Sequence, residues 1–245
     1  MNGPIIQAAG LGVAVGVGTL LGTMAVASEL ESGTVQTAWW LDPKRSRWLR
    51  SRLVAFGTAT LVLLLVLAAT SHWFEALRRP MFDPGASFQA YRFRGPALLG
   101  AGLAAFAVGS FVGAVVGRTL PSMVIAVVVA LGLLGVSHAV VFPNLAEIVP
   151  LLSSAADTPD AIVASRYLDA SGSVLTLDMV KARSPFDTSK QDFWDWASTT
   201  FREVAAGYEG RSYWTVALRE FALWLATAAA LIGATWSVVR RRRPT

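Results

Sequence analysis

Residues 53–70 read LVAFGTATLVLLLVLAAT, a run that contains no charged side chain. A helix needs about 20 mostly apolar residues to cross the roughly 30 Å of hydrocarbon in a bilayer, whereas helices of soluble proteins are usually shorter and amphipathic. Because lipid cannot satisfy free backbone groups, such a run should be an α-helix. The expected spans are Ile5–Ala27, Leu53–Thr70, Pro96–Val116, Ser122–Phe142 and Phe221–Val239. The sequence therefore predicts an all-α integral membrane protein with about five transmembrane helices.

The composition agrees with this class and argues against several others. Hydrophobic residues make up 54% of the 245 residues and charged residues 15%, which is typical of membrane proteins. The chain has no cysteine and two histidines, so disulfides, thiol catalysis and the common zinc sites are not expected. It contains neither a Gly-x-Gly-x-x-Gly pattern nor a P-loop. We therefore expect no cofactor on this chain.

The first apolar run is expected to be a mature span rather than a cleaved signal peptide. No basic region precedes it, and it leads into Glu29 and Glu31. It is also longer than the apolar core of a signal peptide, which usually has about 7–15 residues.

The basic residues indicate the orientation. The net charge is +5, but the basic side chains lie beside the spans, where they act as topology signals, so nucleic-acid binding is not expected. Five spans place the segment 28–52 and the C-terminal tail on the same side. Their basic residues are Lys44, Arg45, Arg47, Arg50, Arg52, Arg240, Arg241, Arg242 and Arg243. Both segments, and with them the C-terminus, are therefore expected in the cytoplasm.

Three regions follow from this topology. Residues 1–142 hold four spans and the cytoplasmic segment 28–52, residues 143–212 form a small exterior α+β cap, and residues 213–245 form the last span and its basic tail. Within the cap, the sequence predicts two strands, Ile162–Leu168 and Val174–Val180, joined by a turn. An amphipathic helix should follow at Phe193, Ala197, Phe201 and Val204. We expect its aromatic face to lie on the bilayer surface or on the outer ends of the spans, with a substrate-facing lip as the alternative.

Small residues repeat within two of the spans. Their spacing of four residues aligns them on one helix face, where another helix can approach closely. The predicted packing positions are Gly12, Gly16, Ala105, Gly109, Gly113 and Gly117, and Gly18 and Gly22 repeat the same spacing.

Glu220 is a candidate for an outer charge site together with Arg219. A carboxylate that enters lipid is costly and is often functional. We expect Glu220 to pair with an arginine at the outer end of the bundle, and proton coupling is the alternative.

The segment 28–52 joins an acidic element to a basic one. It begins Ser28-Glu-Leu-Glu-Ser-Gly-Thr34, continues through Trp39 and Trp40, and ends in a basic stretch with Trp48. We expect a short amphipathic helix along the membrane with its tryptophans at the interface. Gly33 would permit a sharp turn, and Thr34 would cap the helix that follows. An ordinary basic loop with interfacial tryptophans is the alternative.

This order resembles the coupling region of type-2 ABC exporter permeases, in which an E-x-E-x-G-T element and a basic, tryptophan-containing element lie between two spans. The matching residues are Glu29, Glu31, Gly33, Thr34, Arg45, Arg47 and Trp48. The segment Tyr208–Glu220 resembles the family's approach to its final span.

The resemblance implies a permease subunit in a bacterial cell membrane, paired with a second permease chain as a homo- or heterodimer. Two copies of a separate ABC ATPase would bind ATP and Mg and would dock on the coupling segments. The family usually has six spans, whereas only four residues precede the first span here. A late start, a five-span variant and a helix supplied by another polypeptide remain the alternatives.

The leading functional hypothesis is alternating-access export of a small molecule, drug, peptide or lipid. A non-transporting membrane scaffold or sensor, with a ligand-binding exterior cap, is the alternative from another class. A membrane-embedded enzyme ranks third, because no span shows clustered His, Asp or Glu residues of catalytic type.

Overall fold

A computed structural model describes residues 3–33, 45–78, 88, 91–145, 148–150, 162–208 and 212–241. The chain divides into two compact units. One comprises Met1–Arg78, Ala90–Leu145 and Thr215–Thr245, and the other comprises Arg79–Gln89 and Ala146–Trp214. We call them the helical unit and the cap unit.

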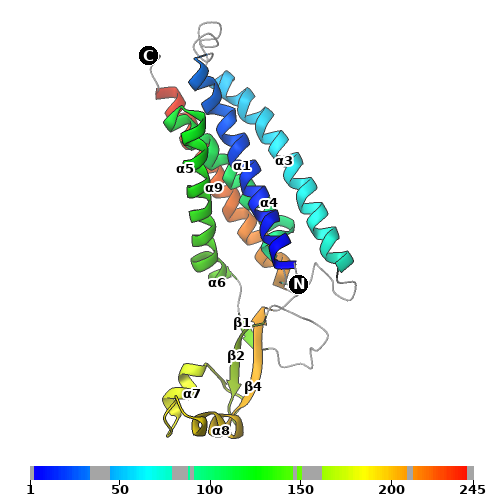
Figure 1. Cartoon of the computed structure of the whole chain (residues 1–245), viewed down its shortest axis with the longest axis vertical. Coiled ribbons are helices and arrows are strands. Elements are labelled where there is room, and N and C mark those ends of the chain that lie inside the picture. Colours follow the sequence, from blue (N-terminus) through cyan, green and yellow to red (C-terminus); the bar gives the residue numbers. More distant parts are fainter. Residues whose placement is uncertain are drawn as a thin grey trace. The chain divides into compact units, whose positions relative to one another are not determined.

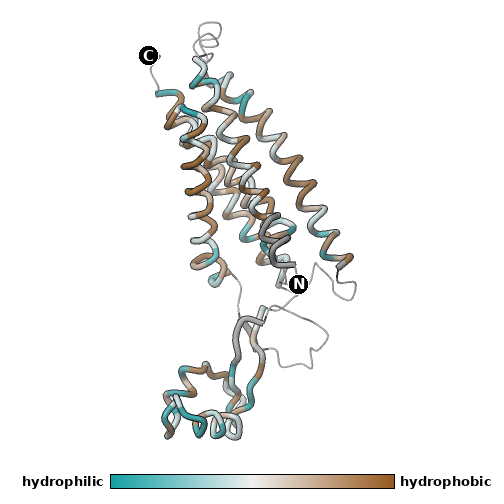
Figure 2. The backbone as a smooth tube through the Cα atoms, in the orientation of Figure 1, coloured by the Kyte–Doolittle hydropathy of each residue, from teal (hydrophilic) through white to brown (hydrophobic). Residues whose placement is uncertain are grey.

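The helical unit contains the predicted spans (Figure 1). Among the described residues, five helices are long and apolar enough to cross a membrane, which confirms the expected number. They are α1 (Gly3–Ser32), α3 (Arg45–Arg78), α4 (Gly95–Val116), α5 (Thr119–Val136) and α9 (Tyr213–Arg241). A π-helical turn, η3 (Ser137–Val141), and α6 (Phe142–Leu145) continue α5. The middles of the helices are mostly apolar and their ends more polar (Figure 2).

The helices extend beyond the apolar runs that predicted them. Helix α1 includes Glu29 and Glu31, and α3 begins eight residues before Leu53, at Arg45. Backbone hydrogen bonding continues a helix past the hydrocarbon boundary, where charged side chains can reach water. Both ends of the segment 28–52 are thus turns of the membrane helices themselves.

Helix α4 forms the centre of this unit. Most of its residues are buried, and it packs against α1, α3 and α5. Helices α3 and α5 expose many large apolar side chains instead, among them Val54, Leu61, Val124 and Leu131. Such a surface suits contact with lipid or with another membrane chain. A short 3₁₀ turn, η2 (Tyr91–Phe93), and Pro96 in the first turn lead into α4.

The cap unit contains a four-stranded antiparallel sheet in the order β1-β4-β2-β3. The strands are β1 (Ile148–Pro150), β2 (Ile162–Leu168), β3 (Val174–Leu175) and β4 (Arg202–Tyr208). The predicted strand Ile162–Leu168 is confirmed. The predicted strand Val174–Val180 is wrong after Leu175, because the Thr176 hydroxyl accepts a hydrogen bond from the Met179 amide and caps α7 (Leu177–Arg183).

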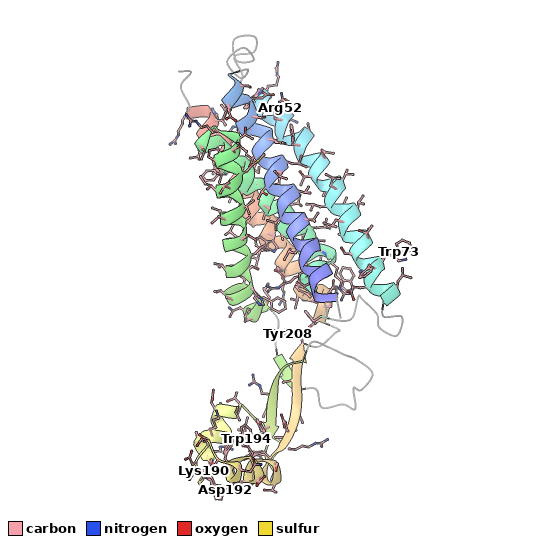
Figure 3. The ribbon with its side chains drawn as sticks, in the orientation of Figure 1. Arg52, Trp73, Lys190, Asp192, Trp194 and Tyr208 are labelled. Atoms are coloured by element: carbon pink, nitrogen blue, oxygen red, sulfur yellow. The ribbon has the colours of Figure 1, made fainter. Side chains whose placement is uncertain are left out.

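The predicted amphipathic helix of the cap also needs correction. Helix α8 (Gln191–Thr200) ends before Phe201, and Val204 lies in β4. Phe193 and Ala197 are buried in the cap's own core, beside Tyr167 and Val180. The apolar face of α8 therefore packs inside the cap unit, whereas Trp194 on the same helix is 43% exposed (Figure 3).

Candidate coupling site at one end of the helical unit

The acidic and basic elements of the segment 28–52 meet at one end of the helical unit. Glu29 and Glu31 lie on the last turns of α1, and Trp48 lies on the first turn of α3. Arg52 follows on α3 and is labelled in Figure 3. Trp48 therefore belongs to a membrane-spanning helix and not to a separate interfacial one. Thr34, Trp39 and Trp40 fall outside the described residues, and Arg45 is the first residue of α3.

Glu29 joins α1 to α3 through two contacts. The indole Nε1 of Trp48 donates a hydrogen bond of 2.7 Å to Oε2 of Glu29, and the Arg52 guanidinium forms an ion pair with Oε1. The Glu29 side chain is only 16% exposed. Hydrogen bonds that involve an ionised group are roughly twice as strong as neutral ones, so these contacts hold the two helix ends together.

Glu31 joins α1 to α5. The backbone N–H of Thr119 donates a hydrogen bond of 2.9 Å to Oε2 of Glu31. Thr119 is the first residue of α5, and the preceding Arg118 provides no side-chain cap. A carboxylate at a helix N-terminus satisfies a free amide and interacts favourably with the helix dipole. Glu31 thus caps a helix that begins 88 residues later in the sequence.

Gly33 follows the end of α1 with a φ of 71°. This left-handed conformation is easily adopted by glycine and is common just after the last helical residue. The sharp turn expected from the sequence is therefore present at this position.

An apolar cluster lies beneath these contacts. It contains Val26 of α1, Leu49 of α3, Ala114 of α4 and Val239 of α9, with Trp48 packed against it. Four of the long helices therefore meet in one cluster at this end. Arg47 and Arg50, on the first turns of α3, are exposed. The acidic side chains and the apolar cluster thus hold the helix ends together, and the exposed arginines lie on the outer surface of these ends.

Glycines bring α1 and α4 into close contact. A Cβ added to Gly22 would lie 2.1 Å from the Phe106 carbonyl oxygen, and one added to Gly18 would lie 2.3 Å from the Gly102 carbonyl oxygen. On α4, a Cβ added to Gly109 would lie 2.5 Å from the Thr19 carbonyl oxygen. Backbones this close leave no room for a side chain.

The other predicted packing positions have different surroundings. Ala105 faces Gly18, and Gly113 faces Ala27. Among the described residues, nothing lies within 4 Å of a Cβ added to Gly12 or Gly16, so α1 approaches α4 through Gly18 and Gly22 instead. Gly117 ends α4 with a φ of 71°, and its N–H bonds to the Gly113 carbonyl.

Glu220 is buried on α9, with 4% of its surface exposed. Its Oε1 accepts hydrogen bonds from the Ser137 hydroxyl at 3.2 Å and from the Trp224 indole at 3.4 Å. Within the described part of the chain, no arginine pairs with it, and Arg219 is exposed. The expected ion pair with an arginine is thus replaced by two neutral donors.

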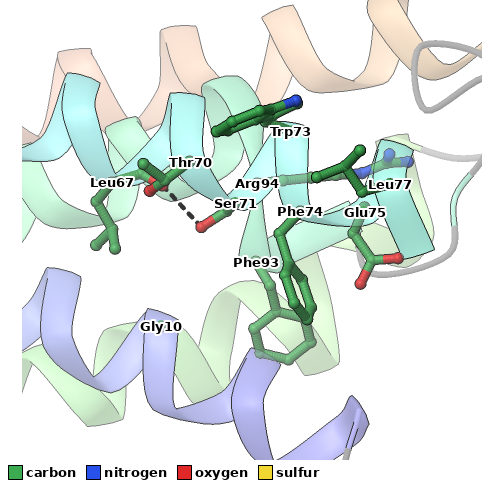
Figure 4. A pocket seen from close by; sticks show the side chains of 10 residues that line it. All are labelled: Gly10, Leu67, Thr70, Ser71, Trp73, Phe74, Glu75, Leu77, Phe93 and Arg94. Atoms are coloured by element: carbon green, nitrogen blue, oxygen red, sulfur yellow. Dashed lines mark hydrogen bonds between the residues drawn. The ribbon is translucent and has the colours of Figure 1, made fainter.

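Sequence reasoning missed a pocket beside α3. It has a volume of about 460 Å³ and contains Trp73, Phe74 and Phe93 together with Glu75 and Arg94 (Figure 4). Glu75 and Arg94 are both buried. Glu75 lies near the end of α3, and Arg94 directly precedes α4. Both fall between the second and third predicted spans, where nothing in the sequence indicates that they lie close together.

The comparison with known families adds to this geometry. A sequence model of the family described as "ABC-2 membrane transporter related" matches residues 4–141, which is more than half of the chain. The chain belongs to this family. The matched residues include α3, α4, α5 and nearly all of α1, and with them Glu29, Glu31 and Trp48. The chain is therefore a permease-like, multi-pass membrane component of an ABC transporter. No curated protein and no solved structure matches the chain.

Proposed function

We propose that this chain is the membrane-spanning permease subunit of an ATP-driven exporter in a bacterial plasma membrane. It would pair with a second permease chain, and two copies of a separate ABC ATPase would bind ATP and Mg. The ends of α1, α3 and α5 would form the surface on which the ATPase docks. Nucleotide-driven motion of the ATPase would then alternate the access of a central path and export the substrate.

The observation that carries this proposal is the attachment of α1 to two other helices at one end. Glu29 binds the start of α3, and Glu31 caps the start of α5. A force applied to the beginning of α3 would therefore act on α1 as well. Because α1 lies tightly against α4 through its glycines, that force would reach the centre of the helical unit. Coupling needs such contiguous contacts between rigid elements.

The acidic residues hold this end of the helical unit together, and exposed basic residues lie on its outer side. Both carboxylates bind groups of this chain, and Arg47 and Arg50 are exposed on α3. Exposed charges contribute mainly to orientation and association rate, but a charge that becomes desolvated in an interface contributes more. Arg50, with Arg47 on the same helix, is therefore proposed to contact the ATPase.

Charge reversal tests this proposal. Arg50→Glu should release the ATPase or uncouple ATP hydrolysis from export in vesicles, with a loss of roughly 2–5 kcal/mol in docking free energy if the contact is desolvated. Lys190→Glu, an exposed position in the cap unit, is the control. Glu31 is not suitable for this test, because its reversal would also remove the cap of α5.

The outcomes separate the two functional classes. Loss of the ATPase in Arg50→Glu, but not in Lys190→Glu, would support the permease function. If no ATPase purifies with the wild-type chain from its native membrane, the scaffold or sensor function gains support instead. Retention of the ATPase and of export in both variants would contradict the proposed docking surface.

A further inference from the structure

A small pocket surrounds the buried carboxylate of Glu220 within the helical unit. It has a volume of about 110 Å³ and is formed by α5, η3 and α9. Its polar contributors are Ser137, Glu220, Trp224 and Thr227, and its walls include Val136 and Leu223. A π-helical turn begins at Ser137, and such turns within helices occur frequently at functional sites.

The hydrogen bonds around this pocket leave one oxygen of Glu220 without a partner. Oε1 accepts from both Ser137 and Trp224, whereas Oε2 is buried and has no hydrogen-bond partner among the described residues. A buried carboxylate oxygen without a donor is costly. The pocket therefore lacks a donor at the position of Oε2.

The other polar groups of the pocket cannot supply this donor. The Ser137 hydroxyl and the Trp224 indole N–H are already directed at Oε1, and the Thr227 hydroxyl donates to the Leu223 carbonyl at 2.9 Å. The unused hydrogen-bonding capacity consists of Oε2 and the lone pairs of the two hydroxyl groups. A ligand that complements this site must donate hydrogen bonds, and a positive charge would compensate the carboxylate.

We infer that the Glu220 pocket binds the primary ammonium group of a molecule whose remaining part is apolar. An ammonium group has three donors and no acceptor, which matches an acceptor-only site. The pocket volume of about 110 Å³ exceeds the volume that one water molecule occupies in the liquid, about 30 Å³. The pocket therefore has room for the ammonium with a small attached group. A quaternary ammonium carries the charge but lacks the donors and should bind less well.

The walls indicate how such a molecule enters. Val136 is 56% exposed and Leu223 is 47% exposed, so the pocket opens on the apolar outer surface of α5 and α9. An apolar body can lie against these helices while its ammonium group reaches Glu220. Entry is thus lateral, from the bilayer. The binding site stands on these contacts alone, whereas the export of the bound molecule rests on the proposed function.

The test uses radiolabelled benzylamine, which is protonated at neutral pH, and the full chain in nanodiscs without any ATPase. Saturable binding, corrected with empty nanodiscs, is measured by scintillation proximity. We expect Glu220→Gln to weaken binding by about tenfold or more, because the loss of a hydrogen bond to a charged group lowers affinity by about that factor. Ser137→Ala should weaken binding by a smaller factor. Glu75→Gln, at a buried glutamate of α3 outside this pocket, should leave binding unchanged.

Competition on the wild-type chain gives a second measurement, which does not depend on the folding of a variant. Unlabelled benzylamine should displace the probe at a concentration about tenfold or more lower than benzyltrimethylammonium or benzyl alcohol requires. Absence of saturable binding, equal competition by all three compounds, or binding that Glu220→Gln leaves intact would each overturn the inference. Because no ATPase is present, failure of the proposed export function would not alter this result, and loss of binding would not affect ATPase docking.

Discussion

The indole Nε1 of Trp48 donates a hydrogen bond of 2.7 Å to the Glu29 carboxylate, and this bond joins the start of α3 to the end of α1. The same carboxylate forms an ion pair with Arg52. Because Glu29 is largely buried, loss of either partner would leave its charge less well satisfied. The contact therefore helps to hold the end of α1 against the start of α3.

Replacement of Trp48 measures this contact. Trp48→Phe keeps an aromatic ring but removes the donor, so it should lower the free energy of unfolding by about 1.5–3 kcal/mol, the range for bonds to charged groups. Trp236→Phe is the matched control, because Trp236 packs against the same apolar cluster. Unfolding would be followed by titration with sodium dodecyl sulfate. Equal losses in the two variants would show that Trp48 acts only through packing.

The close approach of α1 and α4 is tested at two glycines of the same helix. Gly22→Ala places a Cβ 2.1 Å from the Phe106 carbonyl oxygen, so we expect a loss of about 1–3 kcal/mol in unfolding free energy. Among the residues that the structure describes, no atom lies within 4 Å of a Cβ added to Gly16, so Gly16→Ala should be neutral or stabilising by up to about 1 kcal/mol. Thermal unfolding of both variants in one detergent would compare them. The opposite ranking would contradict the helix packing described here.

A pH titration tests the turn between β2 and β3. Hydrogen bonds from the Ser171 hydroxyl and from the Ser171 and Ser173 amides, with Arg183 nearby, lower the pKa of Asp169 below its ordinary value of 3.8. Because the pKa of Asp169 is lower in the folded than in the unfolded state, the ionised side chain stabilises the folded form at neutral pH. This stabilisation is lost as the pH falls below 3.8 and passes through the pKa of the folded state.

The amide resonance of Ser173 reports this titration. Its midpoint should lie below 3.8, and Ser171→Ala should raise the midpoint, because the Ser171 hydroxyl makes the largest contribution to the lowered pKa. A wild-type midpoint at or above 3.8 would mean that the carboxylate is not held by these donors in solution.

Cysteine labelling tests the proposed orientation. The chain has no cysteine of its own, so single substitutions give unambiguous signals. Ser198→Cys in the cap unit and Ser51→Cys near the start of α3 are both exposed positions. A membrane-impermeant maleimide should label Ser198→Cys on intact cells and Ser51→Cys only after permeabilisation. The reverse pattern would place the candidate coupling site outside the cell.

Local sequence patterns predicted the parts of the fold that depend on nearby residues. The five spans follow from the length of each apolar run, and the turn at Gly33 follows from the freedom of glycine at positive φ. In the cap, β2 was predicted correctly, but β3 was extended too far because apolar alternation outweighed the capping signal of Thr176.

Contacts between distant segments could not be predicted in the same way. The bond between Glu31 and Thr119 spans 88 residues, and no local pattern specifies that α1 ends beside the start of α5. The spacing of the glycines in α1 likewise marks possible packing faces but does not specify which of these faces contacts α4. Gly18 and Gly22 make the contact, and Gly12 and Gly16 do not, among the described residues.

Site-specific photo-crosslinking tests the central claim most directly. A photoreactive amino acid replaces Arg50, which is exposed at the start of α3, or Lys190, which is exposed in the cap unit. After irradiation of intact native cells, the cross-linked proteins are identified by mass spectrometry. We predict that position 50 captures a P-loop ABC ATPase and that position 190 does not. Capture of no ATPase at position 50, or equal capture at both positions, would contradict the claim that this end of the helical unit is the coupling site.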